Sequence, residues 1–434
     1  MKMKLSLWKW LVTLSVLASL HAQADDESLV YLRAGTLIDP AAGQALSDQL
    51  ITIRAGLIES VGAFDDAAIP DGAELIDLSD DTVLPGLIDM HVHLTSDAGL
   101  HGYSRLGRSA IRSALYGAHA ARTTLEAGFT TVRNVGAAGF GDVALRDAIN
   151  DGDVVGPRMR VSGPSVGITG GHCDNNLLPP EFDHRSGGVA DGPWAVRERV
   201  RENAKYGADL IKFCATGGVL SRGTTIGARQ YTPEEMTALV DEAHTLGLRV
   251  VAHAHGTEGI KAAIRAGTNT IDHASLLDDE AIRLALEHDT TLVMDIYVTE
   301  YILGQGEEIG ILPESLEKER EVGSAQRESF RRAHKAGVRL AFGTDAGVFP
   351  HGDNARQFYY MVEYGMTPME AIQAATVHAA HALGWSDQVG GIESGHYADL
   401  IAVRGNPLED IRLLESMGFV MKGGQVVVQP GPAR

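Results

Sequence analysis

Two histidines one residue apart are the first side chains in this sequence whose spacing suits a chemical task. His91 and His93 follow the apolar stretch VLPGLIDM, which begins at Val83. In an extended strand, side chains two positions apart point to the same face. Both imidazoles can therefore bind one metal ion. The same spacing also arises in half-buried strands that bind no metal, so the rest of the chain has to decide between the two interpretations.

Four further side chains of metal-binding types stand where later apolar segments end. They are Lys212, His253, His273 and Asp345. Each alone has an ordinary alternative, such as a hydrogen-bonded core histidine, a surface cation or a helix cap. Together with the first two histidines they favour one shared site. Imidazole and carboxylate groups suit Zn²⁺, and Mn²⁺, Co²⁺ or Fe²⁺ also accept them.

The elements that must position these residues are alternating strands and helices between residues 85 and 388. The first predicted strand ends at His93, and the others are expected at 129–133, 158–162, 208–214, 248–253, 270–273, 292–295 and 338–345. Helices are expected at 108–127 and 194–206, and a third begins at Thr232. Eight strand-then-helix units predict an α/β fold, the (β/α)₈ TIM barrel. The candidate ligands then lie at its C-terminal rim, where barrel enzymes carry their active sites.

Residues 25–84 and 389–434 flank this region and have a different pattern. Short alternating apolar and polar segments, such as 50–53 and 425–428, are separated by turns of Gly, Asp and Pro. We expect the two chain ends to assemble one small β-sandwich domain.

The composition indicates a soluble globular protein, with 44% hydrophobic and 22% charged residues among 434. The formal net charge of −20 argues against a nucleic-acid partner, which requires a basic surface.

Residues 1–24 resemble a secretory signal peptide. Three lysines precede an apolar run from Trp10 to Leu20, and Ala22-Gln23-Ala24 supplies the cleavage pattern. The run is short for a membrane span, although an uncleaved anchor is the alternative. We expect an exported protein, periplasmic or secreted, without membrane attachment after cleavage.

The chain has only two cysteines, Cys173 and Cys214. In an exported protein a pair suggests a disulfide. Both cysteines, however, are expected beside the candidate site, where a crosslink has no evident use. We therefore predict free, buried thiols.

Five motifs together resemble the amidohydrolase superfamily, in its binuclear branch with a lysine on the fourth barrel strand. The motifs are LPGLIDMHVHL, IKFCATGG, VVAHAHG, IDHA and FGTDAG. The resemblance extends over nearly the whole mature chain. Within the superfamily the chain is similar to Xaa-Pro dipeptidases and also resembles ochratoxin-type carboxypeptidase-like amidases.

The resemblance implies two divalent metal ions, with Zn²⁺ the favoured ion, and a carbamate on Lys212 that bridges them. His91, His93 and Asp345 would hold one ion, and His253 and His273 the other. A hydroxide bridging the ions would attack the substrate carbonyl. Asp345 would take its proton and pass it to the leaving amine.

The resemblance also assigns residues around the substrate. Tyr231 matches a tyrosine that stabilises the oxyanion, and His172 matches a substrate-facing histidine. The alternative for both is packing at the rim. His255 is a candidate for a supporting or substrate-binding role, and Arg222 or Arg229 for binding a substrate carboxylate, although solvated surface arginines are the alternative.

The expected function is hydrolysis of the amide bond in dipeptides or N-acyl amino acids, by a protein that assembles as a homo-oligomer. Three alternatives remain. The first is a mononuclear deaminase or imidazolonepropionase-like ring amidohydrolase. The second is another binuclear hydrolase, a lactonase or phosphotriesterase. The third alternative is an exported binding protein that keeps the barrel without catalysis.

Overall fold

The computed structural model describes residues 29–429. The predicted signal peptide, residues 1–24, lies outside this range. Within it, no helix is both long and apolar enough to cross a membrane.

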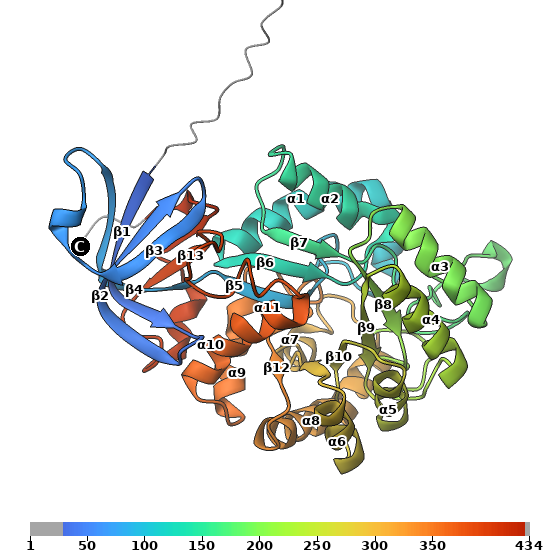
Figure 1. The fold of residues 1–434 in the computed structure, drawn as a ribbon. Coiled ribbons are helices and arrows are strands. Elements are labelled where there is room, and N and C mark those ends of the chain that lie inside the picture. Colours follow the sequence, from blue (N-terminus) through green and yellow to red (C-terminus); the bar gives the residue numbers. More distant parts are fainter. Residues whose placement is uncertain (1–28, 430–434) are drawn as a thin grey trace, which may run out of the picture.

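Strands from both chain ends form one seven-stranded sheet, in the order β15-β14-β13-β4-β1-β2-β3. Its strands are β1 (Leu29–Asp39), β2 (Gln44–Arg54), β3 (Leu57–Ala63), β4 (Glu74–Pro85), β13 (Leu400–Arg404), β14 (Phe419–Lys422) and β15 (Gln425–Val428). Strand β13 pairs antiparallel with β4, where Leu400 lies opposite Pro85. Blue N-terminal and red C-terminal strands lie together in Figure 1. The prediction of one β domain built from both chain ends is confirmed.

Eight parallel strands build the predicted barrel. They are β5 (Leu87–Val92), β6 (Phe129–Asn134), β7 (Arg158–Val161), β8 (Leu210–Cys214), β9 (Arg249–Ala254), β10 (Thr270–His273), β11 (Thr291–Val293) and β12 (Leu340–Ala341). Strands β5–β7 form one hydrogen-bonded group and β8–β12 another. Two isolated bridges join the groups, between Val92 and Ala346 and between Val166 and Phe213. The predicted (β/α)₈ fold is confirmed.

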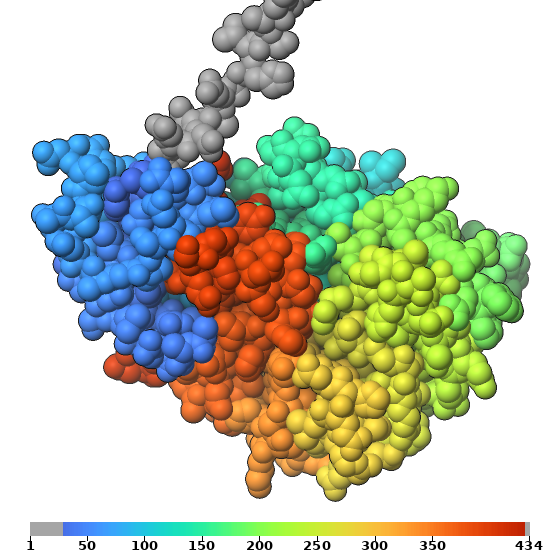
Figure 2. Space-filling model, in the orientation of Figure 1, coloured from blue at the N-terminus to red at the C-terminus, as the bar shows by residue number. Residues whose placement is uncertain are grey.

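Helices surround the strands in Figure 1. Figure 2 shows the surface of the same face, coloured by position along the chain. They are α1 (Ala110–Glu126), α2 (Gly141–Asn150), α3 (Pro193–Lys205), α4 (Pro233–Thr245), α5 (Thr257–Arg265), α6 (Asp279–Glu287), α7 (Val298–Gln305), α8 (Pro313–Lys335), α9 (Gln357–Glu363), α10 (Pro368–Ala374) and α11 (Val377–Leu383). The predicted start at Thr232 is confirmed by a capping box, in which Thr232 and Glu235 each accept a hydrogen bond from the other's backbone N–H.

The sheet domain and the barrel are joined by a continuous chain segment and by an ion pair. Strand β4 runs through Gly86 directly into β5, and a Cβ on Gly86 would lie only 2.0 Å from the Oγ1 of Thr130 in β6. Arg158 of β7 binds Asp399, with 2.9 Å between Nε and Oδ2, and its guanidinium lies 3.4 Å above the Tyr397 ring. These contacts fix the position of the sheet against the barrel.

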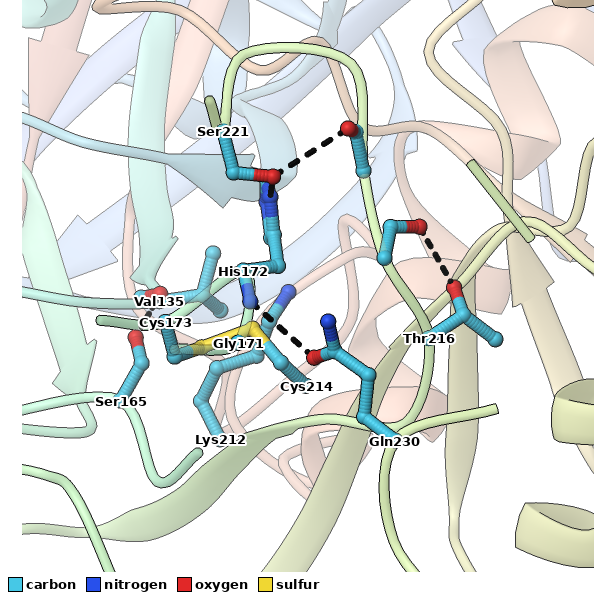
Figure 3. The surroundings of a disulfide bond; sticks show 12 residues. Val135, Ser165, Gly171, His172, Cys173, Lys212, Cys214, Thr216, Ser221 and Gln230 are labelled. Carbon is cyan, nitrogen blue, oxygen red and sulfur yellow. Dashed lines mark hydrogen bonds between the residues drawn. A yellow bond between two sulfur atoms is a disulfide. The ribbon is translucent and has the colours of Figure 1, made fainter. Parts of the chain in front are cut away.

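The two cysteines form a disulfide, Cys173–Cys214, so the prediction of free thiols was wrong. After β7 the chain pairs alongside β8, where the Val166 N–H donates to the Lys212 carbonyl at 2.8 Å. This pairing brings the following loop to the end of β8, with 5.9 Å between the two cysteine Cα atoms. Figure 3 shows the Cys173–Cys214 bond, with His172 on one side of it and Lys212 on the other. The crosslink thus ties the loop that carries His172 to the strand that carries Lys212.

Loss of the Asp399 carboxylate should weaken the contact between the two domains. We expect Asp399→Asn to lower the free energy of unfolding by roughly 3 kcal/mol, because Arg158 would keep a half-buried charge without its partner. Urea unfolding followed by circular dichroism measures this change. The matched control is Asp80→Asn, which removes an exposed partner of Arg404. The control should cost less than about 1 kcal/mol, and equal losses in both variants would contradict the assignment.

The disulfide should be measurable in protein purified without reductant. We expect no thiol to react in denaturant, and two thiols per chain to react after reduction. Cys173→Ala combined with Cys214→Ala should lower the free energy of unfolding by up to about 4 kcal/mol, since the bond closes a loop with a sequence separation of 41 residues. Thiol titration and urea unfolding test the two statements, and two reactive thiols in the unreduced protein would contradict the first.

Candidate active site

The C-terminal ends of the barrel strands surround a cavity of about 680 Å³. All six metal-ligand candidates line it, although they come from five separate parts of the chain: His91, His93, Lys212, His253, His273 and Asp345. The structure therefore brings the whole predicted set to one place.

The first group of donor atoms comes from β5, from His93 just after it, and from the turn after β12. Oδ1 of Asp345 lies 3.2 Å from Nε2 of His93 and 3.5 Å from Nε2 of His91. Asp345 has a φ of 62°, a left-handed conformation that few non-glycine residues adopt. Its N–H donates to the His91 carbonyl at 2.8 Å. The turn thus directs the carboxylate at the two imidazoles, and three donors lie within 4.8 Å of one another.

The second group consists of His253 on β9, His255 just after it and His273 on β10. One donor atom of each lies within 4.8 Å of the others. Nδ1 of His255 is 2.8 Å from the Ser275 hydroxyl, which gives that ring a fixed orientation. Nε2 of His253 is buried and has no hydrogen-bond partner among the described residues. Because a buried nitrogen without a partner is costly, this atom fits a metal ligand.

Lys212 lies in the same cavity and is buried, with only 3% of its surface exposed. Its Nζ is 3.3 Å from Oδ2 of Asp272. Burial lowers the pKa of Lys212, and the neighbouring Arg133 acts in the same direction. The surroundings therefore favour the neutral, nucleophilic amine more than water does.

Burial holds His91 and His255 in the neutral form, in which a ring nitrogen can donate a lone pair to a metal. Burial, with the charge of Lys212, lowers the pKa of His91 to about 4. Burial also lowers the pKa of His255 to about 4. For Asp345, burial acts to raise the pKa, but His91 and His93 outweigh it and hold the pKa below its usual value. Neutral imidazoles beside a carboxylate are what a divalent cation requires.

Two carboxylates orient these ligands and were given no role in the sequence analysis. Asp272 accepts a hydrogen bond from Nδ1 of His91 at 2.8 Å, and Asp295 lies 2.9 Å from Nδ1 of His273. Each contact leaves the Nε2 of that ring for the cavity. The signal was present in the sequence, because Asp272 belongs to the IDHA motif and Asp295 ends the seventh predicted strand.

A third carboxylate links the two chain segments that supply the first group of donors. Asp89 accepts hydrogen bonds from the Thr344 hydroxyl at 2.6 Å and from the His91 N–H at 3.0 Å. Its burial raises its pKa to about 6. Asp89 thereby fixes strand β5 relative to the turn that carries Asp345.

His172 faces the second group. Its ring is stacked on His253 with 4.0 Å between centroids, and its Nδ1 lies 2.8 Å from the Ser221 hydroxyl. Burial, with smaller contributions from the charges of His255, Lys212 and Arg105, lowers the pKa of His172 to about 3. The structure places this residue in the cavity, as its predicted substrate-facing role requires.

Tyr231 does not face the cavity, contrary to the prediction of an oxyanion donor. Its side chain is buried, and its hydroxyl donates to the Ala190 carbonyl at 2.8 Å. The ring lies near Phe213 instead of near the histidines. The packing alternative therefore describes this tyrosine.

The prediction that two arginines bind the substrate was also wrong. Arg222 and Arg229 are exposed and do not line the cavity. Nη1 of Arg222 donates to the Tyr103 hydroxyl at 3.0 Å. Arg105 and Arg108 line the cavity instead. They come from the loop after β5, which contains none of the five motifs.

The geometry agrees with comparisons to known proteins. The model of the amidohydrolase family matches residues 82–427. Ochratoxinase of Aspergillus niger is 35% identical over 436 residues, which covers 94% of this chain and 89% of that protein.

Solved structures extend the comparison to three dimensions. A Xaa-Pro dipeptidase with bound methionine in the active site is 41% identical, has a TM-score of 0.87, and covers 92% of this chain and 99% of its own. A prolidase complexed with N-methylphosphonate-L-proline is 32% identical, has a TM-score of 0.84, and covers 92% of this chain and 100% of its own. This chain is therefore a hydrolase of C–N bonds and belongs to the amidohydrolase family.

Proposed function

We propose that the protein hydrolyses the amide bond of dipeptides or N-acyl amino acids, with two divalent metal ions at the cavity. The observation that carries the proposal is that two groups of three potential metal ligands each line one cavity together with Lys212. The similarity to an ochratoxinase and to dipeptidases supports the same substrate class.

The donor atoms suit metal ions, because those of each group lie within 4.8 Å of one another and Nε2 of His253 is buried without a hydrogen-bond partner among the described residues. His91, His93 and Asp345 would hold one ion, and His253 and His273 the other, with His255 within reach of the second. We propose Zn²⁺, which accepts such nitrogen and oxygen ligands. When bound, the ions would polarise the amide carbonyl and lower the pKa of a water molecule.

Lys212 would join the two groups as a carbamate. Its neutral amine would attack carbon dioxide, form a new N–C bond and release one proton, which gives an anionic group with two oxygen donors. The burial of Lys212 supports this step, because burial disfavours the ammonium form.

Asp345 and His172 would handle protons and hydrogen bonds during the reaction. The low pKa of Asp345 keeps it a carboxylate that can accept a proton from the attacking water and deliver it to the leaving nitrogen. His172 engages Ser221 through Nδ1, which leaves Nε2 for the substrate oxygen as negative charge develops on it.

Export of the protein is part of the proposal. The disulfide between Cys173 and Cys214 supports it, because such bonds persist in oxidising compartments outside the cytosol.

Product formation from a substrate panel tests the function. Xaa-Pro dipeptides, N-acyl aromatic amino acids, cyclic amides and lactones would be incubated with Zn²⁺-loaded protein and with a chelator-treated control. We expect cleavage of the first two classes that is lost in the chelator-treated control. Mass spectrometry of the products measures this cleavage. Cleavage of lactones or cyclic amides alone would contradict the proposal, as would amide cleavage that persists without metal.

The ligand assignment predicts the metal content of variants. The parent protein should bind two Zn²⁺ ions per chain, and His93→Ala should bind about one, because only the first donor group is damaged. The value of kcat/KM should fall by about 100-fold or more. Elemental analysis after dialysis measures the ions. The control is His378→Ala on α11, whose ring contacts the Leu340 carbonyl away from the cavity. Two ions retained in His93→Ala would refute the assignment.

A further inference from the structure

Arg105 is a cation of the cavity wall that the proposed reaction does not use. It lies in the 3-10 turn Gly102–Gly107, in the loop after β5, and lines the same cavity as the histidines. The arginine and lysine side chains that line this cavity in the described structure are Arg105, Arg108 and Lys212.

The other two cations have partners. Nη1 of Arg108 binds Oδ2 of Asp97 at 2.5 Å, and its guanidinium lies 4.6 Å from the centre of the Tyr116 ring. Lys212 contacts Asp272. Asp97 thus compensates the charge of Arg108, although Nε and Nη2 of Arg108 are buried without a hydrogen-bond partner among the described residues. Lys212 is already assigned to the carbamate.

Arg105 has no such partner. Among the described residues its side chain makes neither an ion pair nor a hydrogen bond, although it is accessible to solvent. The chain carries 57 acidic and 37 basic residues, so acidic partners are plentiful in general. An unpaired guanidinium in the wall of a cavity offers five N–H donors to an anion that enters from solution.

The surroundings of Arg105 suit a ligand that is charged at one point and apolar beside it. A Cβ on Gly102, in the same turn, would lie 3.2 Å from Cδ2 of Leu312, so the turn packs against the segment between α7 and α8. That segment and its helices give the cavity an apolar wall, formed by Val298, Ile302, Ile311, Leu312 and Val322. A guanidinium beside this wall matches an amino acid with a free carboxylate and a hydrophobic side chain.

We propose that Arg105 binds the free carboxylate of the amino acid on the leaving side of the scissile amide. The inference rests on the proposed function and narrows it: the enzyme would require a substrate whose amide nitrogen belongs to a C-terminal residue with an unblocked carboxylate. Guanidinium and carboxylate groups form paired, charge-assisted hydrogen bonds, which would orient the amide toward the histidines.

Matched substrates with and without the carboxylate test this inference. The pairs are Ala-Pro with Ala-Pro amide, and N-benzoyl-phenylalanine with its C-terminal amide. We expect the parent enzyme to cleave the better acid at least 10-fold more efficiently than its amide. Arg105→Gln should lower kcat/KM for the acid by about 10- to 100-fold, mainly through KM, and leave the amide unchanged. Arg105→Lys should recover part of the loss, because it restores the charge without the paired geometry.

The control is Arg229→Gln, an exposed arginine outside the cavity, which should keep the parent preference. Metal content and thermal unfolding of every variant would establish that the site and the fold are intact. If the parent enzyme cleaves the acids but Arg105→Gln keeps the same preference, the role of Arg105 is refuted and the proposed function stands. If the parent enzyme cleaves no member of either pair, the proposed function fails and the inference fails with it.

Discussion

The site depends on one carboxylate with no access to solvent, that of Asp272. It binds the guanidinium of Arg133 at 2.9 Å, Nδ1 of His91 at 2.8 Å and Nζ of Lys212 at 3.3 Å. These groups belong to β6, β5 and β8, so one side chain of β10 holds three other strands of the barrel in register. Arg133 also donates to the Met90 carbonyl through Nε. Loss of the carboxylate would leave buried cations without a counter-charge, a defect that typically costs about 3 to 5 kcal/mol.

The same principle recurs around the cavity. Asp89 ties β5 to the turn that carries Asp345, and Asp295 orients His273. Each acid sits behind a residue that faces the cavity and fixes its direction. The rigidity of the site therefore comes from buried carboxylates in the barrel, while the loops above supply the groups that meet the substrate.

The fold and the inner site were predictable because both follow from local patterns. Alternation of apolar strands with helices identified the barrel, and residues at strand ends, such as His253 and Asp345, necessarily share one rim. Loops obey no such periodicity. The sequence around Tyr231 contains nothing that shows its hydroxyl turning toward Ala190, and Cys173 reaches Cys214 only through the course of a long connection. For the same reason the sequence did not reveal that Arg105 lines the cavity, and Arg222 was wrongly predicted to bind the substrate. The direction of a loop side chain is set by tertiary contacts.

Strand β4 passes directly into β5. The number of residues at this junction therefore affects which face of β5 carries the histidine ligands. Side chains alternate between the two faces of a strand, so the distance in sequence from the sheet pairing at Pro85 to His91 decides which face the histidines occupy. One residue added or removed at Gly86 would turn both imidazoles away from the cavity while every ligand remained in the chain. The register of the small sheet is thus linked through Gly86 to that of β5, which also pairs with β6 in the barrel.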